Sequence, residues 1–264
     1  MSKENSAATR ADVRDIFSLR DQHALITGGG TGLGLGIARC FVSAGARVTL
    51  VGRRPEPLRA AVAELGPAAA WLQADISRLR ENGALIAEAE RKHGPLHILV
   101  NNAGIHLKKP ALDTTDDEFQ AVIATHVFGG FSLSRDAARR MLARGEGSIL
   151  FIASVTSFVG MPQVVAYSAA KAALPGMVRA LAAEWSSRGV RVNAIAPGWI
   201  QSEMLDKALA SDPDRRRRIL NRTPMGRMGD AEDIGWTAVY LCSRAARFMT
   251  GTVLPVDGGA TTGF

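Results

Sequence analysis

The feature that most constrains the fold is a regular alternation of short apolar runs and helical patterns along almost the whole chain. The apolar runs are nearly continuous, as is typical of strands buried in a parallel sheet. They predict strands at residues 23–27, 47–51, 69–73, 96–100, 148–153, 190–196 and 252–256. No repeat, linker or low-complexity stretch breaks this order. The sequence therefore predicts one doubly wound α/β domain, a seven-stranded parallel sheet with helices on both faces and right-handed crossovers.

Two stretches fall outside the alternation. Residues 1–14 are polar with mixed charge, so we expect a disordered N-terminal tail before a domain that spans residues 15–264. The tail lacks the apolar block of a signal peptide. Within the domain, the polar and basic stretch 199–230 interrupts the order of strands and helices. We expect this insertion to form a lid over the substrate.

Composition narrows the class of protein. The net charge of +7 comes largely from short clusters such as residues 53–54 and 215–218, and no aromatic side chains interleave with them. We therefore expect no nucleic-acid partner, and a basic surface that attracts small anions. No apolar run approaches the ~20 residues that span a bilayer, so no membrane partner is expected. Cys40 and Cys242 lack ligand or redox spacing, which indicates reduced core thiols of a cytoplasmic protein and no metal site.

A glycine-rich turn follows the first predicted strand directly. The motif is Thr27-Gly28-x3-Gly32-x-Gly34, and a helical pattern begins at once after it. Strand, glycines and helix in this order place a pyrophosphate on a helix N-terminus, because small residues let the backbone turn tightly and approach the phosphates. The spacing departs from Gly-x-Gly-x-x-Gly, since position 33 is leucine. The turn predicts a dinucleotide site.

The end of the second predicted strand bears on the choice of dinucleotide. An acidic side chain roughly 20 residues past the glycines would bind the ribose 2′-hydroxyl of NAD, but Gly52, Arg53 and Arg54 stand there. Gly52 leaves room, and the Arg53 guanidinium suits bidentate binding of a 2′-phosphate. The sequence therefore favours NADP and leaves NAD possible. Plain surface charge is the alternative interpretation of both arginines.

A second constellation lies on a long apolar helical pattern. Tyr167 and Lys171 are four residues apart and share one helix face, so the ammonium can lie beside the phenol. A fixed cation favours the phenolate and lowers its pKa towards a range useful for proton transfer. The pair alone is a weak signal, because packing plus a solvated charge explains it equally well. It gains weight because other polar positions follow predicted strand ends, where doubly wound sheets bind ligands. These are the glycine turn, Arg53, Asp75, Asn102, Ser154 and Pro197.

Taken together and in this order, the motifs resemble the short-chain dehydrogenase/reductase family. The matching motifs are Thr27-Gly28-x3-Gly32-x-Gly34, Asn101-Asn102-Ala103-Gly104, Ser154, Tyr167-x3-Lys171, Pro197-Gly198 and Asp257-Gly258-Gly259. The resemblance covers residues 16–260. It implies a Rossmann fold, a nicotinamide-dependent oxidoreductase that acts on a carbonyl or a secondary alcohol, and a homotetramer.

The resemblance also implies roles for particular positions. Tyr167 would exchange a proton with the substrate oxygen, Lys171 would lower the tyrosine pKa and bind the nicotinamide ribose, and Ser154 would orient the substrate. Besides Tyr167 and Lys171, the implied coenzyme contacts are Gly28, Thr31, Gly32, Leu33, Gly34, Arg53, Asp75, Ile76, Asn102, Ala103, Gly104, Pro197, Gly198, Ile200 and Ser202.

One position departs from the family pattern. Alignment places His126 where the family has an asparagine that organises a water beside the catalytic lysine. An imidazole can bind such a water through one ring nitrogen, which would preserve the proton relay and make His126 part of the catalytic set. The alternative is a histidine held by packing on the helix face, with the relay arranged otherwise.

The substrate is constrained only loosely. Residues 101–110, 196–204 and 223–227 resemble the gluconate 5-dehydrogenase and 2-deoxygluconate dehydrogenase-like group within the family. Lys108 and Lys109 would suit the carboxylate of a sugar acid, and solvated loop charges are the alternative. A reductase of 3-oxoacyl carrier proteins or other ketones is a second possibility, although Ala183 stands where many such enzymes have arginine. A non-catalytic dinucleotide sensor is a third, but it would not need a serine, a tyrosine and a lysine in these positions.

Overall fold

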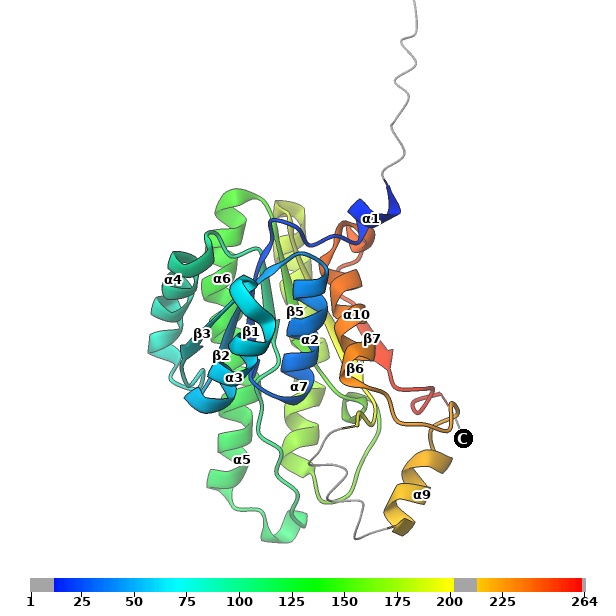
Figure 1. Ribbon diagram of the computed structural model, residues 1–264. Helices are drawn as coiled ribbons and strands as arrows, with labels where there is room; N and C mark the ends of the chain where they lie inside the picture. Colours follow the sequence, from blue (N-terminus) through cyan, green and yellow to red (C-terminus); the bar gives the residue numbers. More distant parts are fainter. Residues whose placement is uncertain (1–11, 202–212, 263–264) are drawn as a thin grey trace, which may run out of the picture.

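A seven-stranded sheet forms the centre of the molecule. The computed structural model of the chain describes residues 12–201 and 213–262. All neighbouring strands run parallel, in the order β3-β2-β1-β4-β5-β6-β7. The chain builds outward from β1 to β3, crosses back to β4 and then builds outward in the other direction (Figure 1). The reversal between β1 and β4 is where doubly wound sheets bind ligands.

The strands confirm the predicted positions to within two residues at each end. They are β1 (His23–Thr27), β2 (Arg47–Gly52), β3 (Ala69–Gln73), β4 (Ile98–Asn101), β5 (Gly147–Ile152), β6 (Val190–Pro197) and β7 (Val253–Val256). All of β1 and β4 is buried. Strands covered on both faces need no polar side, which explains the nearly continuous apolar runs.

Helices cover both faces of the sheet, as the sequence predicts. They are α1 (Val13–Ile16), α2 (Gly32–Ser43), α3 (Pro55–Leu65), α4 (Asn82–His93), α5 (Asp116–Ile123), α6 (Gly130–Arg144), α7 (Val165–Trp185), α9 (Pro213–Asn221) and α10 (Ala231–Cys242). The short helical turns are η1 (Gly66–Ala68), η2 (Leu79–Glu81), η3 (Ala111–Asp113), η5 (Val155–Ser157), η6 (Ser186–Arg188) and η7 (Arg244–Ala246). Side chains of α2, α3 and α10 pack on one face with Ile26 of β1, and those of α4, α6 and α7 pack on the other face with Leu25. Successive residues of β1 thus enter opposite cores.

The long helix after β4 is not regular. The sequence predicts a single helix over residues 116–142, whereas the structure has α5, a π-helical turn η4 (Ala124–Gly129) and α6. Two glycines let this turn approach the sheet closely. A Cβ on Gly129 would lie 3.0 Å from the Ile76 carbonyl oxygen, and one on Gly130 would lie 3.3 Å from the Phe151 ring. Single π-helical turns inside α-helices are frequent at functional sites.

A short helix stands before the first strand, inside the stretch expected to be a tail. The helix α1 begins at Val13, so its first two residues lie within the stretch 1–14 that was expected to be the tail. The Asp12 carboxylate caps it by accepting a hydrogen bond from the Arg14 amide at 2.9 Å. Residues 1–11 lie outside the described part of the chain.

The predicted lid is described in two pieces, residues 199–201 and 213–230. They are joined by a bridge between Ile200 and Gly229, and α9 lies beyond the lower edge of the sheet in Figure 1. Residues 202–212 lie outside the described part, so closure over a substrate stays a prediction. Among the described helices, none has the length and the apolar character needed to cross a membrane.

Candidate active site

The glycine turn between β1 and α2 is built for close backbone contact. Gly28 has a φ of 66°, in the left-handed region that favours glycine. A Cβ on Gly34 would lie 2.1 Å from the Gly28 carbonyl oxygen, and one on Gly28 would lie 2.8 Å from the Asn102 amide nitrogen. A larger residue at either position would fill the turn. The turn therefore fits the predicted dinucleotide, whose phosphates need close approach to a helix N-terminus.

A hydrogen-bond cluster joins this turn to the end of β4. The Thr27 hydroxyl donates to the Val100 carbonyl at 3.2 Å and accepts from the Asn102 and Ala103 amides, both at 3.0 Å. The Asn102 side-chain amide donates to the Thr27 carbonyl at 2.9 Å. The side chain of Asn102 thus holds the two strand ends together, a structural role beside its predicted coenzyme contact.

A cavity of about 290 Å³ opens beside the turn at the carboxyl ends of β1, β2, β3 and β4. It brings together many of the predicted coenzyme positions. Those that line it are Gly28, Thr31, Arg53, Asp75, Ile76, Asn102, Ala103 and Gly104. The sequence also missed lining residues, among them Pro57, Leu58, Ile105 and Thr125. Their only sequence signal is that each lies a few positions past a strand end or beside His126.

The remaining predicted positions do not line this cavity. Leu33 packs against the core beside α2, while Gly32 and Gly34 belong to the first turn of α2. At the end of β6, Gly198 packs against Asp257, where a Cβ would lie 2.7 Å from the Asp257 Cα. Ile200 lines a separate cavity with Trp199. Ser202 lies outside the described residues.

The charges around the coenzyme cavity are arranged for an anion. Arg53 and Arg54 both line it and are exposed, and the end of β2 carries no acid, as the sequence shows. The Asp75 carboxylate accepts hydrogen bonds from the Ser77 amide at 3.0 Å and from its hydroxyl at 2.7 Å. Burial opposes the charge of Asp75, but these hydrogen bonds, together with the charges of Arg53 and Arg78, outweigh it and lower its pKa. Asp75 is thus hydrogen-bonded within its own turn, while Arg53 lines the cavity.

Ser154, Tyr167 and Lys171 come together as the sequence predicts. Tyr167 and Lys171 lie one turn apart on α7, and the Lys171 Nζ lies 5.5 Å from the centre of the tyrosine ring. The Lys171 Nζ donates to the Ile152 carbonyl at 2.5 Å, at the end of β5. Ser154 follows β5 directly, and its hydroxyl accepts from the Thr156 amide at 3.1 Å.

Burial controls the protonation of this group. Lys171 is 4% exposed, and burial lowers its pKa to about 7. Burial raises the pKa of Tyr167 above its usual value, and a hydrogen bond with Ser154 acts in the opposite direction. The expectation that the pKa of Tyr167 is lowered is therefore wrong. The physical reason is that desolvation disfavours the phenolate more than its neighbours stabilise it.

His126 lies in the π-helical turn and is buried against Tyr167. The two rings meet edge to face, with centres 5.5 Å apart. The His126 Nε2 lies 3.1 Å from the Ile105 amide nitrogen and 3.0 Å from the Ile105 carbonyl oxygen, so it accepts from one or donates to the other according to its tautomer. Burial, and after it the charge of Lys171, lowers the pKa of His126 to about 3, so the imidazole is neutral at neutral pH.

The space for this imidazole depends on Gly104. A Cβ on Gly104 would lie 2.1 Å from the His126 Cε1. Nε2 is occupied by the backbone of Ile105, so a relay water would have to bind Nδ1, and the catalytic role of His126 stays a prediction. His126 connects the loop that lines the coenzyme cavity to the ring of Tyr167.

The loop after β4 also supplies a residue that the sequence did not single out. The ring of His106 lies 5.1 Å from that of Tyr167. The signal that could have found it is its position two residues past Gly104, in the loop after β4. In the same loop, Lys109 Nζ binds both carboxylate oxygens of Glu118, at 3.0 and 2.9 Å. Lys109 is therefore held in an ion pair, which counts against its proposed contact with a substrate carboxylate.

Fold and relatives together define the class of protein: an NAD(P)-dependent oxidoreductase. The family model described as enoyl-(acyl carrier protein) reductase matches residues 28–261. A putative short-chain alcohol dehydrogenase from Sinorhizobium meliloti 1021 superposes with a TM-score of 0.90 at 36% identity, over 94% of this chain and 100% of that chain. The chain belongs to the short-chain dehydrogenase/reductase family.

Several relatives are named for activities on polyols and sugar acids. The chain is 44% identical to galactitol 2-dehydrogenase (L-tagatose-forming) from Cereibacter sphaeroides, over 95% of this chain and 99% of the relative. The structure of a gluconate 5-dehydrogenase from Burkholderia cenocepacia J2315, in complex with NADP and tartrate, matches with a TM-score of 0.90 at 35% identity and covers 96% of this chain and 100% of that one. The predicted similarity to the gluconate 5-dehydrogenase group is confirmed.

Proposed function

We propose that this enzyme interconverts a secondary alcohol and a ketone on a polyol or a sugar acid, with NADP as its preferred coenzyme. The observation that carries the proposal is the continuous path from the coenzyme cavity to the reaction centre. Ile105 lines the cavity and binds His126, and His126 packs on Tyr167. The substrate class is supported by the relatives named galactitol 2-dehydrogenase and gluconate 5-dehydrogenase.

The residues of the chain handle the substrate oxygen. When bound, the coenzyme would supply a hydride to the substrate carbon from its reduced form, NADPH, and its oxidised form, NADP+, would accept one from the alcohol. Tyr167 gives a proton to the oxygen during reduction and takes it back during oxidation, while the Ser154 hydroxyl donates a hydrogen bond that orients the oxygen. A raised phenol pKa keeps Tyr167 protonated at neutral pH, which suits the reductive direction. Lys171, with a pKa of about 7, stabilises the phenolate when its ammonium is charged.

The preference for NADP rests on charge at the end of β2. Arg53 and Arg54 line the coenzyme cavity, and Gln73 fixes their loop by donating to the Arg53 carbonyl at 2.9 Å. A guanidinium binds a phosphate through two parallel hydrogen bonds. NAD lacks the 2′-phosphate and would not gain this interaction.

His126 acts in this proposal as a positioning residue. It holds Gly104 and Ile105 against the ring of Tyr167 through one backbone contact and one edge-to-face contact. Since the imidazole is neutral, it adds no charge beside Lys171. The lysine therefore keeps its ammonium available for the phenol.

Turnover with a panel of substrates tests the proposal. Nicotinamide absorbance would be followed with galactitol, gluconate, a simple ketone and an acyl thioester, with NADP and with NAD, and Tyr167→Phe would serve as the inactive control. We expect turnover of a polyol or a sugar acid that is lost in Tyr167→Phe. Preferred turnover of the acyl thioester would support an acyl reductase instead. Coenzyme binding without turnover of any substrate in either direction would indicate a sensor.

Oligomerisation and location complete the proposal. Phe128 and Phe131 are exposed on the outer side of the helix formed by α5, η4 and α6, which supports association with further copies into a homotetramer. The free, buried Cys40 and Cys242 support a place in the reducing cytoplasm. Sedimentation of Phe128→Asp beside the wild type tests the tetramer, because a charge on that face would dissociate it.

A further inference from the structure

A second cavity lies at the edge of the sheet opposite the coenzyme cavity. Its volume is about 510 Å³, and its walls come from the amino ends of β4, β5 and β6, the segment before β1, and the turn after α10. No residue that we place at the reaction centre or around the coenzyme lines it. It is a separate feature of the molecule.

Arginine side chains dominate the charge of this cavity. Arg20 comes from the segment before β1, Arg191 from β6, and Arg244 and Arg247 from the turn after α10. Within residues 12–201 and 213–262, none of the four takes part in an ion pair. Four arginines from three parts of the chain thus line one space, and the described residues supply none of them with a carboxylate in an ion pair.

Arg191 is the fixed member of this group. One guanidinium nitrogen donates to the Leu241 carbonyl at 2.7 Å and to the Met249 carbonyl at 3.2 Å, and the other lies 3.5 Å from the Ser148 hydroxyl. These neutral acceptors orient the guanidinium but do not neutralise it. Burial lowers the pKa of Arg191, which is the effect expected for a cation that has left water without meeting an anion.

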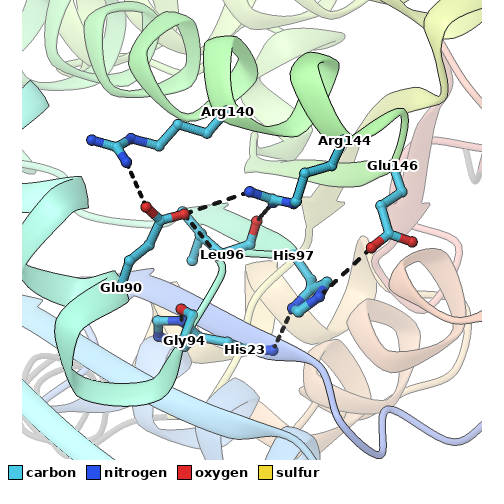
Figure 2. A network of polar contacts seen from close by, with 8 residues as sticks. All are labelled: His23, Glu90, Gly94, Leu96, His97, Arg140, Arg144 and Glu146. Carbon is cyan, nitrogen blue, oxygen red and sulfur yellow. Dashed lines mark hydrogen bonds and ion pairs between the residues drawn. The ribbon is translucent and has the colours of Figure 1, made fainter.

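The acids on the wall do not balance these cations. They are Asp15, which is exposed on α1, and Glu146. Figure 2 shows Glu146 directed towards His97, with Nε2 and a carboxylate oxygen 3.7 Å apart. The His97 Nδ1 accepts from the His23 amide at 3.1 Å, so the proton of a neutral His97 sits on Nε2 and points at Glu146. Glu146 keeps its negative charge, so the wall carries two carboxylates against four guanidinium groups.

We propose that this cavity binds a small oxyanion carrying at least two negative charges, either inorganic phosphate or an oligocarboxylate, separately from coenzyme and substrate. Guanidinium groups bind both kinds of anion through paired hydrogen bonds. An anion there joins the segment before β1, β6 and the turn after α10, which lie far apart in the sequence.

Calorimetric titration tests the proposal on the full chain. Inorganic phosphate and citrate would each be titrated at constant ionic strength into protein saturated with NADP, because free phosphate also competes for the coenzyme site. Arg244→Gln and Arg247→Gln each remove one cavity charge. Arg80→Gln, an exposed arginine of η2 that does not line the cavity, removes the same charge elsewhere.

We expect saturable binding of at least one anion, weakened roughly three- to tenfold by Arg244→Gln and by Arg247→Gln and unchanged by Arg80→Gln. Binding of phosphate alone assigns the site to phosphate groups, and binding of citrate alone assigns it to carboxylic acids. The proposal is overturned by the absence of saturable binding of both anions, or by an equal loss in the cavity variants and in Arg80→Gln.

Discussion

Burial determines the chemistry of individual residues at this reaction centre. The pKa of the Lys171 amine is lowered to about 7, and the pKa of the His126 imidazole is lowered to about 3. Both shifts follow from the cost of placing a cation in an apolar environment. The phenol of Tyr167 moves in the opposite direction because its charged form is an anion. The result at neutral pH is a protonated acid beside an amine that is close to half charged.

The role of His126 is tested by asparagine. An asparagine amide can donate to the Ile105 carbonyl or accept from its amide, so His126→Asn is expected to keep kcat within about tenfold of the wild type. His126→Ala removes the partner of Ile105 and the edge contact with Tyr167, so it should lose more. Steady-state kinetics of the two variants measure the difference. A folded His126→Asn that binds coenzyme yet shows no turnover would mean that the imidazole itself is required.

We expect Arg53 to set the choice of coenzyme. Arg53→Ala should weaken NADP binding about 10- to 100-fold, because a charge-assisted hydrogen bond contributes roughly 1.5–3 kcal/mol. Binding of NAD should change little. Fluorescence titration with both coenzymes measures the ratio, and Arg80→Ala serves as a control for net charge. The same preference for NADP in Arg53→Ala as in the wild type would contradict the phosphate contact.

Between elements, one missing Cβ allows the loop after β4 to meet the π-helical turn. Gly104→Ala places a methyl group 2.1 Å from the His126 ring, so either the loop or the ring must move. We expect kcat to fall by about tenfold or more and stability to fall by about 1–3 kcal/mol. Kinetics and thermal unfolding would be measured together. Gly160→Ala is the matched control, since nothing lies within 4 Å of its added Cβ.

A double variant tests whether the added methyl group of Gly104→Ala acts by its clash with the His126 ring or in another way. If the clash with the imidazole is the cause, Gly104→Ala combined with His126→Asn should lose less than the two single variants do together. Strictly additive losses would show that Gly104 is needed for another reason.

Elements also show what the sequence could and could not predict. The strands and the polar residues at their ends were predictable because apolar runs and glycine turns are local signals. The π-helical turn was not, because residues 124–129 carry no local signal comparable to an apolar run or a glycine turn. Lys109 could not be assigned, because its partner Glu118 belongs to the capping box of α5 and is brought near only by the folded loop. The raised pKa of Tyr167 depends on burial, which only the tertiary structure defines.

Across the whole molecule, buried histidines link stability to pH. Burial lowers the pKa of His23 to about 4, and its ring nitrogens contact the Gly94 carbonyl and the Thr49 hydroxyl, both at 2.9 Å. Figure 2 shows His23 beside His97 in the network at the amino ends of the strands. His126 is buried at the opposite edge, with a pKa of about 3. In the folded state, the buried imidazoles of His23 and His126 therefore take up a proton less readily than in the unfolded chain, at both edges of the sheet.

Acid should consequently destabilise the fold before most carboxylates titrate. Unfolded histidine binds protons near pH 6.5. Stability should therefore be greatest above that value and should fall as the pH drops towards the folded pKa of His23, about 4. His23 accounts for up to about 3 kcal/mol of this loss, at about 1.4 kcal/mol per pKa unit. Thermal midpoints at pH 7.5, 6 and 5 measure the slope, which His126→Asn should reduce. A midpoint independent of pH over this range would contradict the linkage.

The π-helical turn has a consequence for how the chain can change. Each residue advances an α-helix by about 100°, so a turn with one extra residue resets the rotational phase of everything after it. His126 lies within this turn and contacts Tyr167, and the exposed Phe131 follows it in α6. Deleting a single residue from η4 would rotate His126 and Phe131 relative to each other by about 100°, so only one of them could keep its present orientation. The orientation of His126 towards Tyr167 and that of Phe131 towards the outer surface therefore depend on each other. An insertion or deletion in this helix cannot alter one of them independently of the other.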